Sequence, residues 1–211
     1  MNKTLETKGN TMYIRDRKGW LAGGMLALLG GALTGCAGPG VGSAELIASY
    51  EQALVASEAQ AVADLDQDPE RLAAFVARAE AYFRDITQES VRDLTRETYA
   101  PDGYLNDTLK VITGAEAIEE YFYETAGNTD AVRVEFLSYA ATGMDVYVRW
   151  RMTIEAPRLA DEPLVSYGVS QFRFDEQGRL LIHKDFWDSG GNFFEHLPFV
   201  GRAIRSIRGR L

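Results

Sequence analysis

The sequence predicts an α+β fold in which a curved antiparallel or mixed sheet wraps around helices. Two observations predict it. Residues 44–97 carry apolar side chains at helical spacing, whereas residues 131–187 contain four runs that alternate as strands do. A cone-shaped sheet closed by helices leaves a cavity between its two layers, so we expect a ligand site there.

Composition narrows the class of protein. The 211 residues are 46% apolar and 25% charged, which is typical of a folded chain, and the net charge of −9 argues against general nucleic-acid binding. The charge is uneven. Residues 37–201 hold 13 basic and 29 acidic side chains, whereas the last ten residues hold four arginines and no acid. We therefore expect the C-terminal tail to have a separate role.

The first 36 residues have the order of a bacterial lipoprotein signal. A basic stretch is followed by an apolar stretch that is shorter than the ~20 residues of a membrane-spanning helix, and then by Leu33-Thr34-Gly35-Cys36. This last string resembles the lipobox, which implies cleavage before Cys36 and attachment of lipid, including palmitate, to it. Ala37 in place of an aspartate implies the outer membrane by the same resemblance. The alternative is an unmodified cysteine.

The remaining elements follow in order. Residues 44–65 are predicted to form a helix, Asp68 and Pro69 to begin a second one that extends to Ile86, and residues 88–97 to form a third. The predicted organisation is a signal peptide (1–35), a linker (36–43), an extra helix (44–67), the main domain (68–190) and a basic amphipathic tail (191–211).

Residues 99–114 have the texture of two brief strands. Thr113-Gly-Ala-Glu116 matches a capping box that opens a helix over 115–126. Four strands are then expected at 131–141, 145–156, 164–175 and 179–187.

Two polar residues are candidates for catalysis in the first half of the domain. Strand alternation places Asp107 on the face of Leu105, where burial would raise the carboxyl pKa as a general base requires, unless Asp107 only caps a turn. Tyr82 lies in the apolar stripe of its helix. Its hydroxyl either serves as a hydrogen-bond donor into the cavity or lies at the rim of the core.

The last strand contains the stretch HKDFWD, residues 183–188. Alternation puts His183, Asp185 and Trp187 on one face, and we predict that face to line the cavity. His183 and Asp185 form either an acid–base pair or two metal ligands, but a third ligand is missing, so no metal is expected. Ser170 shares a face with Gly168, and their small side chains leave room either for a ligand or for a packed helix.

The stretches YAPDGYLNDTLKVITGAEAI and QFRFDEQGRLLIHKDFWD resemble the SnoaL-like and nuclear transport factor 2-like superfamily, which includes ketosteroid isomerase and limonene-epoxide hydrolase. The resemblance covers residues 68–190 and implies the conical α+β fold. It implies a proton-abstracting role for Asp107 and an oxyanion-stabilising role for Tyr82. Ser170 stands where the isomerase has a neutral aspartate.

The resemblance to the epoxide hydrolase implies a different set of catalytic residues. Asp185 falls on one catalytic aspartate, and Arg151 matches the arginine, whereas Thr153 replaces the second aspartate. Neither catalytic set is therefore complete.

Three functions follow as hypotheses. The first is a lipid-anchored domain at the outer membrane, facing the periplasm, that binds a small apolar molecule without turnover. The second is an isomerase or hydrolase that uses Asp107 or Asp185, and the third is a non-catalytic envelope module that dimerises through its sheet. No cofactor motif is present. The Arg-rich tail predicts either a membrane contact, beside the lipidated Cys36, or a helix packed on its own domain.

Overall fold

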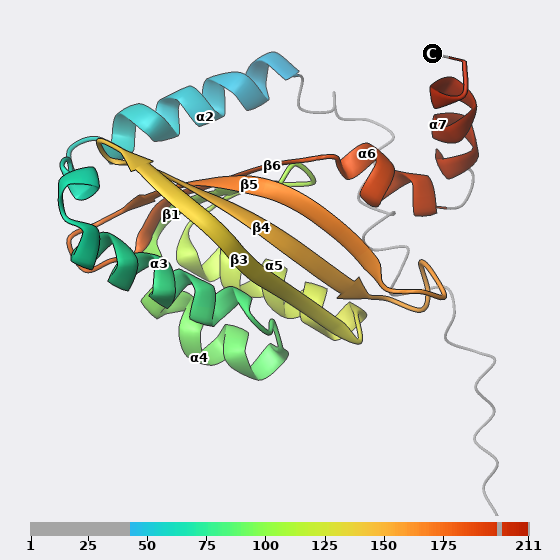
Figure 1. Ribbon diagram of the computed structural model, residues 1–211, viewed down its shortest axis with the longest axis horizontal. Helices are drawn as coiled ribbons and strands as arrows, with labels where there is room; N and C mark the ends of the chain where they lie inside the picture. The colour runs from blue at the N-terminus through green and yellow to red at the C-terminus, as the bar shows by residue number, and fades with distance from the viewer. Residues whose placement is uncertain (1–42, 198–199, 211) are drawn as a thin grey trace, which may run out of the picture. The chain divides into compact units, whose positions relative to one another are not determined.

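The computed structural model describes residues 43–197 and 200–210, so Cys36 and the signal-like segment lie outside the described residues. The predicted α+β class is confirmed, with one six-stranded sheet packed against helices (Figure 1). The helices are α2 (Ser43–Ser57), η1 (Leu65–Gln67), α3 (Pro69–Phe83), α4 (Gln88–Thr98), α5 (Ala115–Asn128), α6 (Ser189–Asn192), η2 (Phe194–His196) and α7 (Val200–Arg208). The strands are β1 (Tyr99–Asn106), β2 (Val111–Thr113), β3 (Ala131–Thr142), β4 (Asp145–Glu155), β5 (Leu164–Phe174) and β6 (Leu180–Trp187).

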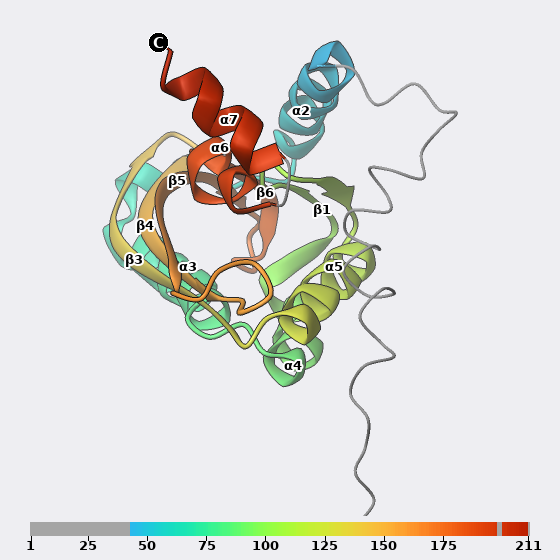
Figure 2. The ribbon, with the colours of Figure 1, turned by 90° about the vertical axis from the view of Figure 1, so that its right-hand side faces the viewer.

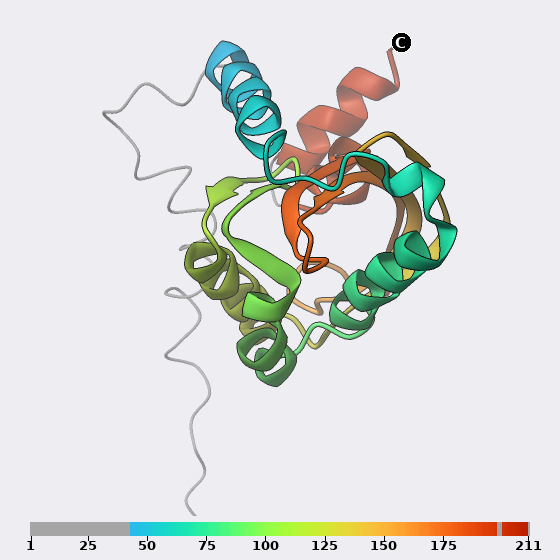
Figure 3. The same ribbon diagram turned by 90° about the vertical axis from the view of Figure 1, so that its left-hand side faces the viewer.

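The strand order in the sheet is β2-β1-β6-β5-β4-β3. Strands β1 and β6 are parallel, and every other neighbouring pair is antiparallel, so the sheet is mixed. The sheet curves strongly, and α3, α4 and α5 lie along its inner side (Figures 2 and 3). Helix α2 lies on the outer side (Figure 1).

Local sequence signals set most helix starts. Asp68 accepts a hydrogen bond from the backbone N–H of Arg71 at 3.0 Å, and Pro69 opens α3 as predicted. The predicted capping box at Thr113 is wrong, because Gly114 is the N-cap of α5 and makes no side-chain cap bond. Thr113, in β2, is still paired with Tyr104 of β1. The chain therefore turns into α5 one residue later, at a glycine with φ of 97°.

The first predicted helix is too long. Helix α2 ends at Ser57 rather than at residue 65. The backbone N–H of Val62 instead donates to the carbonyl of Phe174 at 3.0 Å, and Ala61 bridges to Asp175. Pairing with the end of β5 therefore draws this segment out of the helix.

Aromatic rings from α3 and α5 pack against the inner face of β5. Phe83 lies 6.3 Å from Phe172 and 6.1 Å from Phe122, measured between ring centroids, and Tyr82 lies 4.9 Å from Phe83. Packed rings thus occupy much of the space that the sequence predicted as a cavity. In the part of the chain that is described, no helix combines the length and apolar character needed to cross a bilayer.

Candidate functional site

The register of three strands brings the predicted site residues to one face. In the β5–β6 pair, Phe172 lies opposite His183, Ser170 opposite Asp185 and Gly168 opposite Trp187. Phe172 belongs to the buried core, so this face is the inner one. In the parallel β1–β6 pair, Leu105 lies beside His183. Asp107, two residues further along, therefore comes close to Asp185.

Asp185 is held by neighbours on β5 and β6. The hydroxyl of Ser170 donates to Oδ1 of Asp185, and Nε2 of His183 lies 2.9 Å from the same oxygen. Ser170 in turn accepts from the indole N–H of Trp150 at 2.8 Å. Because one donor on each side fixes Oδ1, the carboxyl group has a defined orientation.

The other oxygen of Asp185, Oδ2, has no hydrogen-bond partner among the described residues. No buried side-chain nitrogen or oxygen in that part of the chain lacks a partner, and the Asp185 side chain is 15% exposed. Solvent or a ligand can therefore reach Oδ2. An oriented carboxylate with one accessible oxygen is the arrangement that a general base requires.

His183 connects Asp185 to Tyr99. Nδ1 of the imidazole lies 2.6 Å from the hydroxyl oxygen of Tyr99. A neutral His183 that donates from Nε2 to Asp185 must accept at Nδ1, so Tyr99 is the donor. Burial raises the pKa of Tyr99 well above its ordinary value, which keeps that proton on the hydroxyl.

Asp107 forms a second group beside the first. It follows β1 and accepts from the backbone N–H groups of Leu109 at 2.9 Å and Lys110 at 2.8 Å, so it caps a turn. Its Oδ2 also accepts from the hydroxyl of Tyr121 on α5, and its carbonyl accepts from the indole of Trp187 at 2.9 Å. We call Tyr99, Asp107, Tyr121, Ser170, His183 and Asp185 the inner polar cluster.

Burial raises the pKa of Asp107 above its usual range, and the charge of Asp185 raises it further. The hydrogen bonds from Tyr121 and Lys110 act in the opposite direction. The same burial, with the charge of Asp107 beside it, raises the pKa of Tyr121 and keeps it a proton donor. Asp107 is thus both the turn-capping residue and the desolvated carboxyl that the sequence offered as alternatives.

Tyr82 is buried, and its hydroxyl lies 2.9 Å from Oγ1 of Thr95. Thr95 uses its one hydroxyl hydrogen on the carbonyl of Val91 at 2.6 Å, so Tyr82 must be the donor to Thr95. The proton of Tyr82 therefore points to α4 and not to the inner polar cluster. Tyr121 is the tyrosine that donates to Asp107.

The room beside Gly168 is occupied. A Cβ atom at this position would collide with the indole ring of Trp150, so the glycine accommodates that ring. Arg151 and Thr153 alternate with the inner residues Trp150 and Met152 on β4. They consequently lie on the outer face, away from Asp185.

The inner face becomes accessible along β4. Val146 and Val148 are fully buried, whereas Met152 and Ile154 are half-buried. Asp107, Tyr121, Asp185 and Trp187 are half-buried as well. This end of the inner face, which we call the open end, combines apolar side chains with the accessible carboxyl of Asp185.

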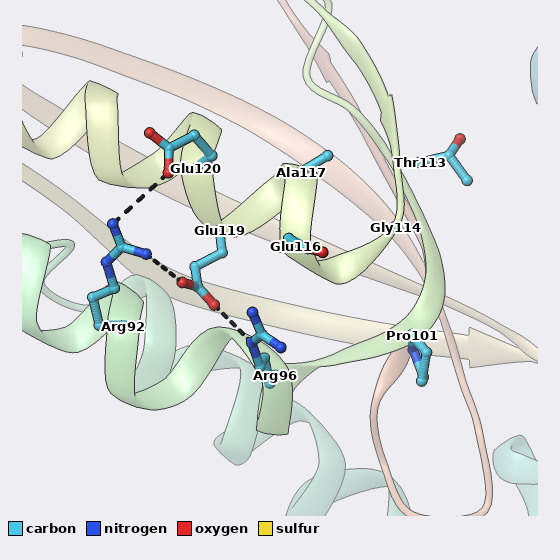
Figure 4. Close-up of a pocket in the computed structure, with 9 residues that line it drawn as sticks. All are labelled: Arg92, Arg96, Pro101, Thr113, Gly114, Glu116, Ala117, Glu119 and Glu120. Atoms are coloured by element: carbon cyan, nitrogen blue, oxygen red, sulfur yellow. Dashed lines mark hydrogen bonds and ion pairs between the residues drawn. The ribbon is translucent and has the colours of Figure 1, made fainter.

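A groove of about 620 Å³ lies elsewhere, between α4 and the start of α5 (Figure 4). Its centre is Glu119, whose carboxylate accepts from Arg92 at 2.8 Å and from Arg96 at 2.9 Å. None of the predicted site residues line this groove. In residues 43–197 and 200–210, no group of three or more His, Cys, Asp or Glu side chains could hold a metal ion.

Sequence reasoning did not single out Tyr99, Tyr121 or Trp150 for the site. Tyr121 shares a helical face with Ile118 and Phe122, and Trp150 alternates in phase with Val148 and Met152, so the sequence pattern places both side chains on inner faces. Contact with Asp107 or Ser170, however, depends on strand register and helix docking, which a linear pattern does not contain.

Residues 79–183 match the family model described as SnoaL-like domain. This part of the chain is a SnoaL-like domain. The chain is similar to a protein of ketosteroid isomerase-like fold from Catenulispora acidiphila in complex with trimethylamine (16% identity, 56% of this chain and 88% of that chain, TM-score 0.48). It is also similar to an LEH-like epoxide hydrolase from M. tuberculosis (15% identity, 58% and 84%, TM-score 0.44).

A nuclear transport factor 2-like protein from Exiguobacterium sp. 255-15 is similar at 13% identity over 54% of this chain and 98% of that chain, with a TM-score of 0.45. The comparison with curated proteins gave no match. The SnoaL-like domain begins within α3 and ends within β6, so α2 and the C-terminal helices lie beyond the matched range.

Proposed function

We propose that the SnoaL-like domain binds a small apolar molecule at the open end and transfers a proton to or from it. The apolar part of the proposal rests on the half-buried side chains of β3 and β4 that face inward at this end: Val134, Phe136, Met152 and Ile154. The chemical part rests on one observation. Asp185 is oriented by Ser170 and His183, while its Oδ2 remains accessible beside Asp107.

In this proposal Asp185 is the general base. Its accessible oxygen takes a proton either from a carbon next to a carbonyl group or from a water molecule that attacks an epoxide. His183 stabilises the charge on Asp185 through Nε2, and Tyr99 keeps the imidazole in the required tautomer. The proposed role of Asp185 therefore involves no direct contact with Tyr82 or Arg151.

Asp107 is the complementary acid. Asp107 is assigned as the acid of the two neighbouring carboxyl groups because burial raises its pKa. A protonated Asp107 would donate its proton to an oxygen atom that becomes negative during the reaction, and the hydroxyl of Tyr121 would stabilise the Asp107 carboxylate that remains. The catalytic activity of the protein is then expected to decrease as pH rises through the pKa of Asp107.

The experiment uses two probe substrates, a cyclic β,γ-unsaturated ketone for isomerisation and a cyclic alkene epoxide for hydrolysis. Asp185→Asn should lower turnover by at least about 100-fold while binding, read from the intrinsic tryptophan fluorescence, remains. The matched control is Asp102→Asn, an exposed aspartate on β1, which should leave turnover unchanged.

Full turnover by Asp185→Asn would refute the role of Asp185 as base. If the wild-type protein binds both probes and converts neither, its function is binding without turnover. This second candidate function is favoured by the hydrogen bonds among Trp150, Ser170, Asp185 and His183, which also suit a purely structural network.

We also propose that the domain is tethered to the bacterial envelope, at the outer membrane and facing the periplasm. The support is the lipobox-like string that ends at Cys36. Cells fed labelled palmitate should incorporate it into the wild-type chain and not into Cys36→Ser. Equal labelling of both chains would contradict lipidation at this residue.

A further inference from the structure

Helix α7 has an apolar stripe that is exposed except at Ile204, which is half-buried. Val200, Ala203, Ile204 and Ile207 recur at the spacing that places them on one side of a helix. Val200 is 43% exposed and Ile207 is 61% exposed. The contacts of α7 with its own domain therefore leave most of this stripe uncovered.

The domain instead contacts another side of α7. Gly201 is buried, and a Cβ atom there would collide with the carbonyl oxygen of Glu195 in η2. Arg205 donates to that carbonyl at 2.6 Å, and Arg208 pairs with Glu195 and, at 3.0 Å, with Asp188. At 100° per residue, Gly201, Arg205 and Arg208 lie about a quarter turn or more from the centre of the apolar stripe. Polar contacts therefore hold α7 with its apolar side outward.

The charge of this helix indicates what covers the stripe. Residues 200–210 contain Arg202, Arg205, Arg208 and Arg210 and no acidic residue, in a chain whose net charge is −9. A second copy paired two-fold through the stripe would bring arginines against arginines. An anionic lipid surface offers both acyl chains for the stripe and phosphate groups for the arginines.

A second exposed apolar group lies on the same side of the domain. Leu46 and Ile47, at the start of α2, are 39% and 58% exposed. The start of α2 and the whole of α7 project from the same side, away from α4 (Figures 1, 2 and 3). Ser43, the first residue of α2, also follows closely on Cys36, the predicted lipid anchor.

We propose that α7, together with the start of α2, binds the surface of an anionic lipid bilayer. The apolar stripe enters the boundary between headgroups and acyl chains, and Arg210, seven residues after Ala203 and so beside the stripe, contacts lipid phosphates. This surface would fix the orientation of the SnoaL-like domain relative to the membrane. It does not depend on the proposed catalysis.

The test reads α7 itself, because the apolar signal-like segment could bind lipid independently. The full chain carries Cys36→Ser and Ala203→Cys, and an environment-sensitive fluorophore is attached to the new thiol. With vesicles that contain phosphatidylglycerol, we expect a blue shift and quenching by lipid-borne quenchers. Val200→Ser with Ile207→Ser should weaken the response at least tenfold, and Arg210→Gln about fivefold.

The matched control carries the fluorophore at Glu97→Cys, an exposed position on α4, and should show no shift. Absence of a shift at Ala203, or an equal shift with purely zwitterionic vesicles, would overturn the proposal. A blue shift that increases with protein concentration in the absence of vesicles would also overturn it, because a second copy would then cover the stripe.

Discussion

At the residue scale, the raised pKa of Asp107 makes the stability of the fold depend on pH. Its carboxyl group is partly desolvated, and its pKa is raised above the ordinary 3.8. The folded state therefore binds this proton more tightly than the unfolded state does. As pH rises through the ordinary and then the raised pKa, this group lowers the free energy of unfolding, and the loss is complete above the raised pKa.

We predict that Asp107→Asn removes this part of the pH dependence and makes the protein more stable at neutral pH. The amide oxygen can still accept from the backbone of Leu109 and Lys110. Urea unfolding between pH 4 and pH 8 measures the effect, and carboxyl titration by NMR measures the pKa directly. An ordinary pKa for Asp107 would contradict both the desolvation argument and its role as acid.

Ser170 supports a second prediction. Ser170→Ala leaves the buried indole N–H of Trp150 without an acceptor and removes one donor from Asp185, so we expect a loss of about 1–3 kcal/mol in the free energy of unfolding. Ser166→Ala on the same strand is the control, because Ser166 is also buried but takes no part in the hydrogen bonds of Trp150 and Asp185. Equal losses in the two variants would show that packing, and not the hydrogen bonds, is responsible.

At the element scale, Glu119 joins α4 to α5. Its side chain is 7% exposed because Arg92 and Arg96 lie across it, and their hydrogen bonds hold the pKa of the carboxyl below its ordinary 4.5. Stability from a lowered pKa is present above the ordinary value and is lost as pH falls through the lowered one. The interaction of Glu119 with Arg92 and Arg96 therefore contributes less stability under acid conditions.

We predict that Glu119→Gln costs about 1 kcal/mol at neutral pH, a modest loss because both guanidinium groups remain in water. The same substitution should also remove part of the acid sensitivity. Glu120→Gln is the control, since Glu120 is 60% exposed and lies 3.8 Å from Arg92. Thermal unfolding at pH 7 and pH 4 measures both variants, and a pH-independent difference would contradict the ionic explanation.

Elements were more predictable than their arrangement. Alternation gave β3 to β6 within about two residues, because each of these strands buries one face against helices. The end of α2 was missed because Val62 pairs with Phe174, far away in the sequence. The parallel pairing of β1 with β6 was equally hidden, since periodicity shows which face of a strand is buried and not which strand lies beside it.

At the scale of the whole molecule, one arginine connects the added helix α2 to the SnoaL-like domain. Arg173 on β5 is almost fully buried and donates to the carbonyl of Leu54 at 2.8 Å and to Ser57 at 3.1 Å. Its Nε also pairs with Asp145 at 2.6 Å. A cation at the C-terminal end of α2 is favourable for the helix dipole, so the helix is held by more than surface contact.

We predict that Arg173→Met lowers the free energy of unfolding by about 3 kcal/mol, because Asp145 loses its partner and the last carbonyls of α2 lose a donor. Hydrogen exchange should increase in α2 and stay unchanged in α3, since the broken contacts concern the outer side of the sheet. Arg133→Met is the control: its pairs with Asp85 and Glu155 are solvent-exposed, and their loss should be hardly measurable. If α2 keeps its protection in Arg173→Met, its attachment depends on other contacts, such as the hydrogen bond from the hydroxyl of Tyr50 to Gln171 on β5, and Arg173 stabilises the sheet alone.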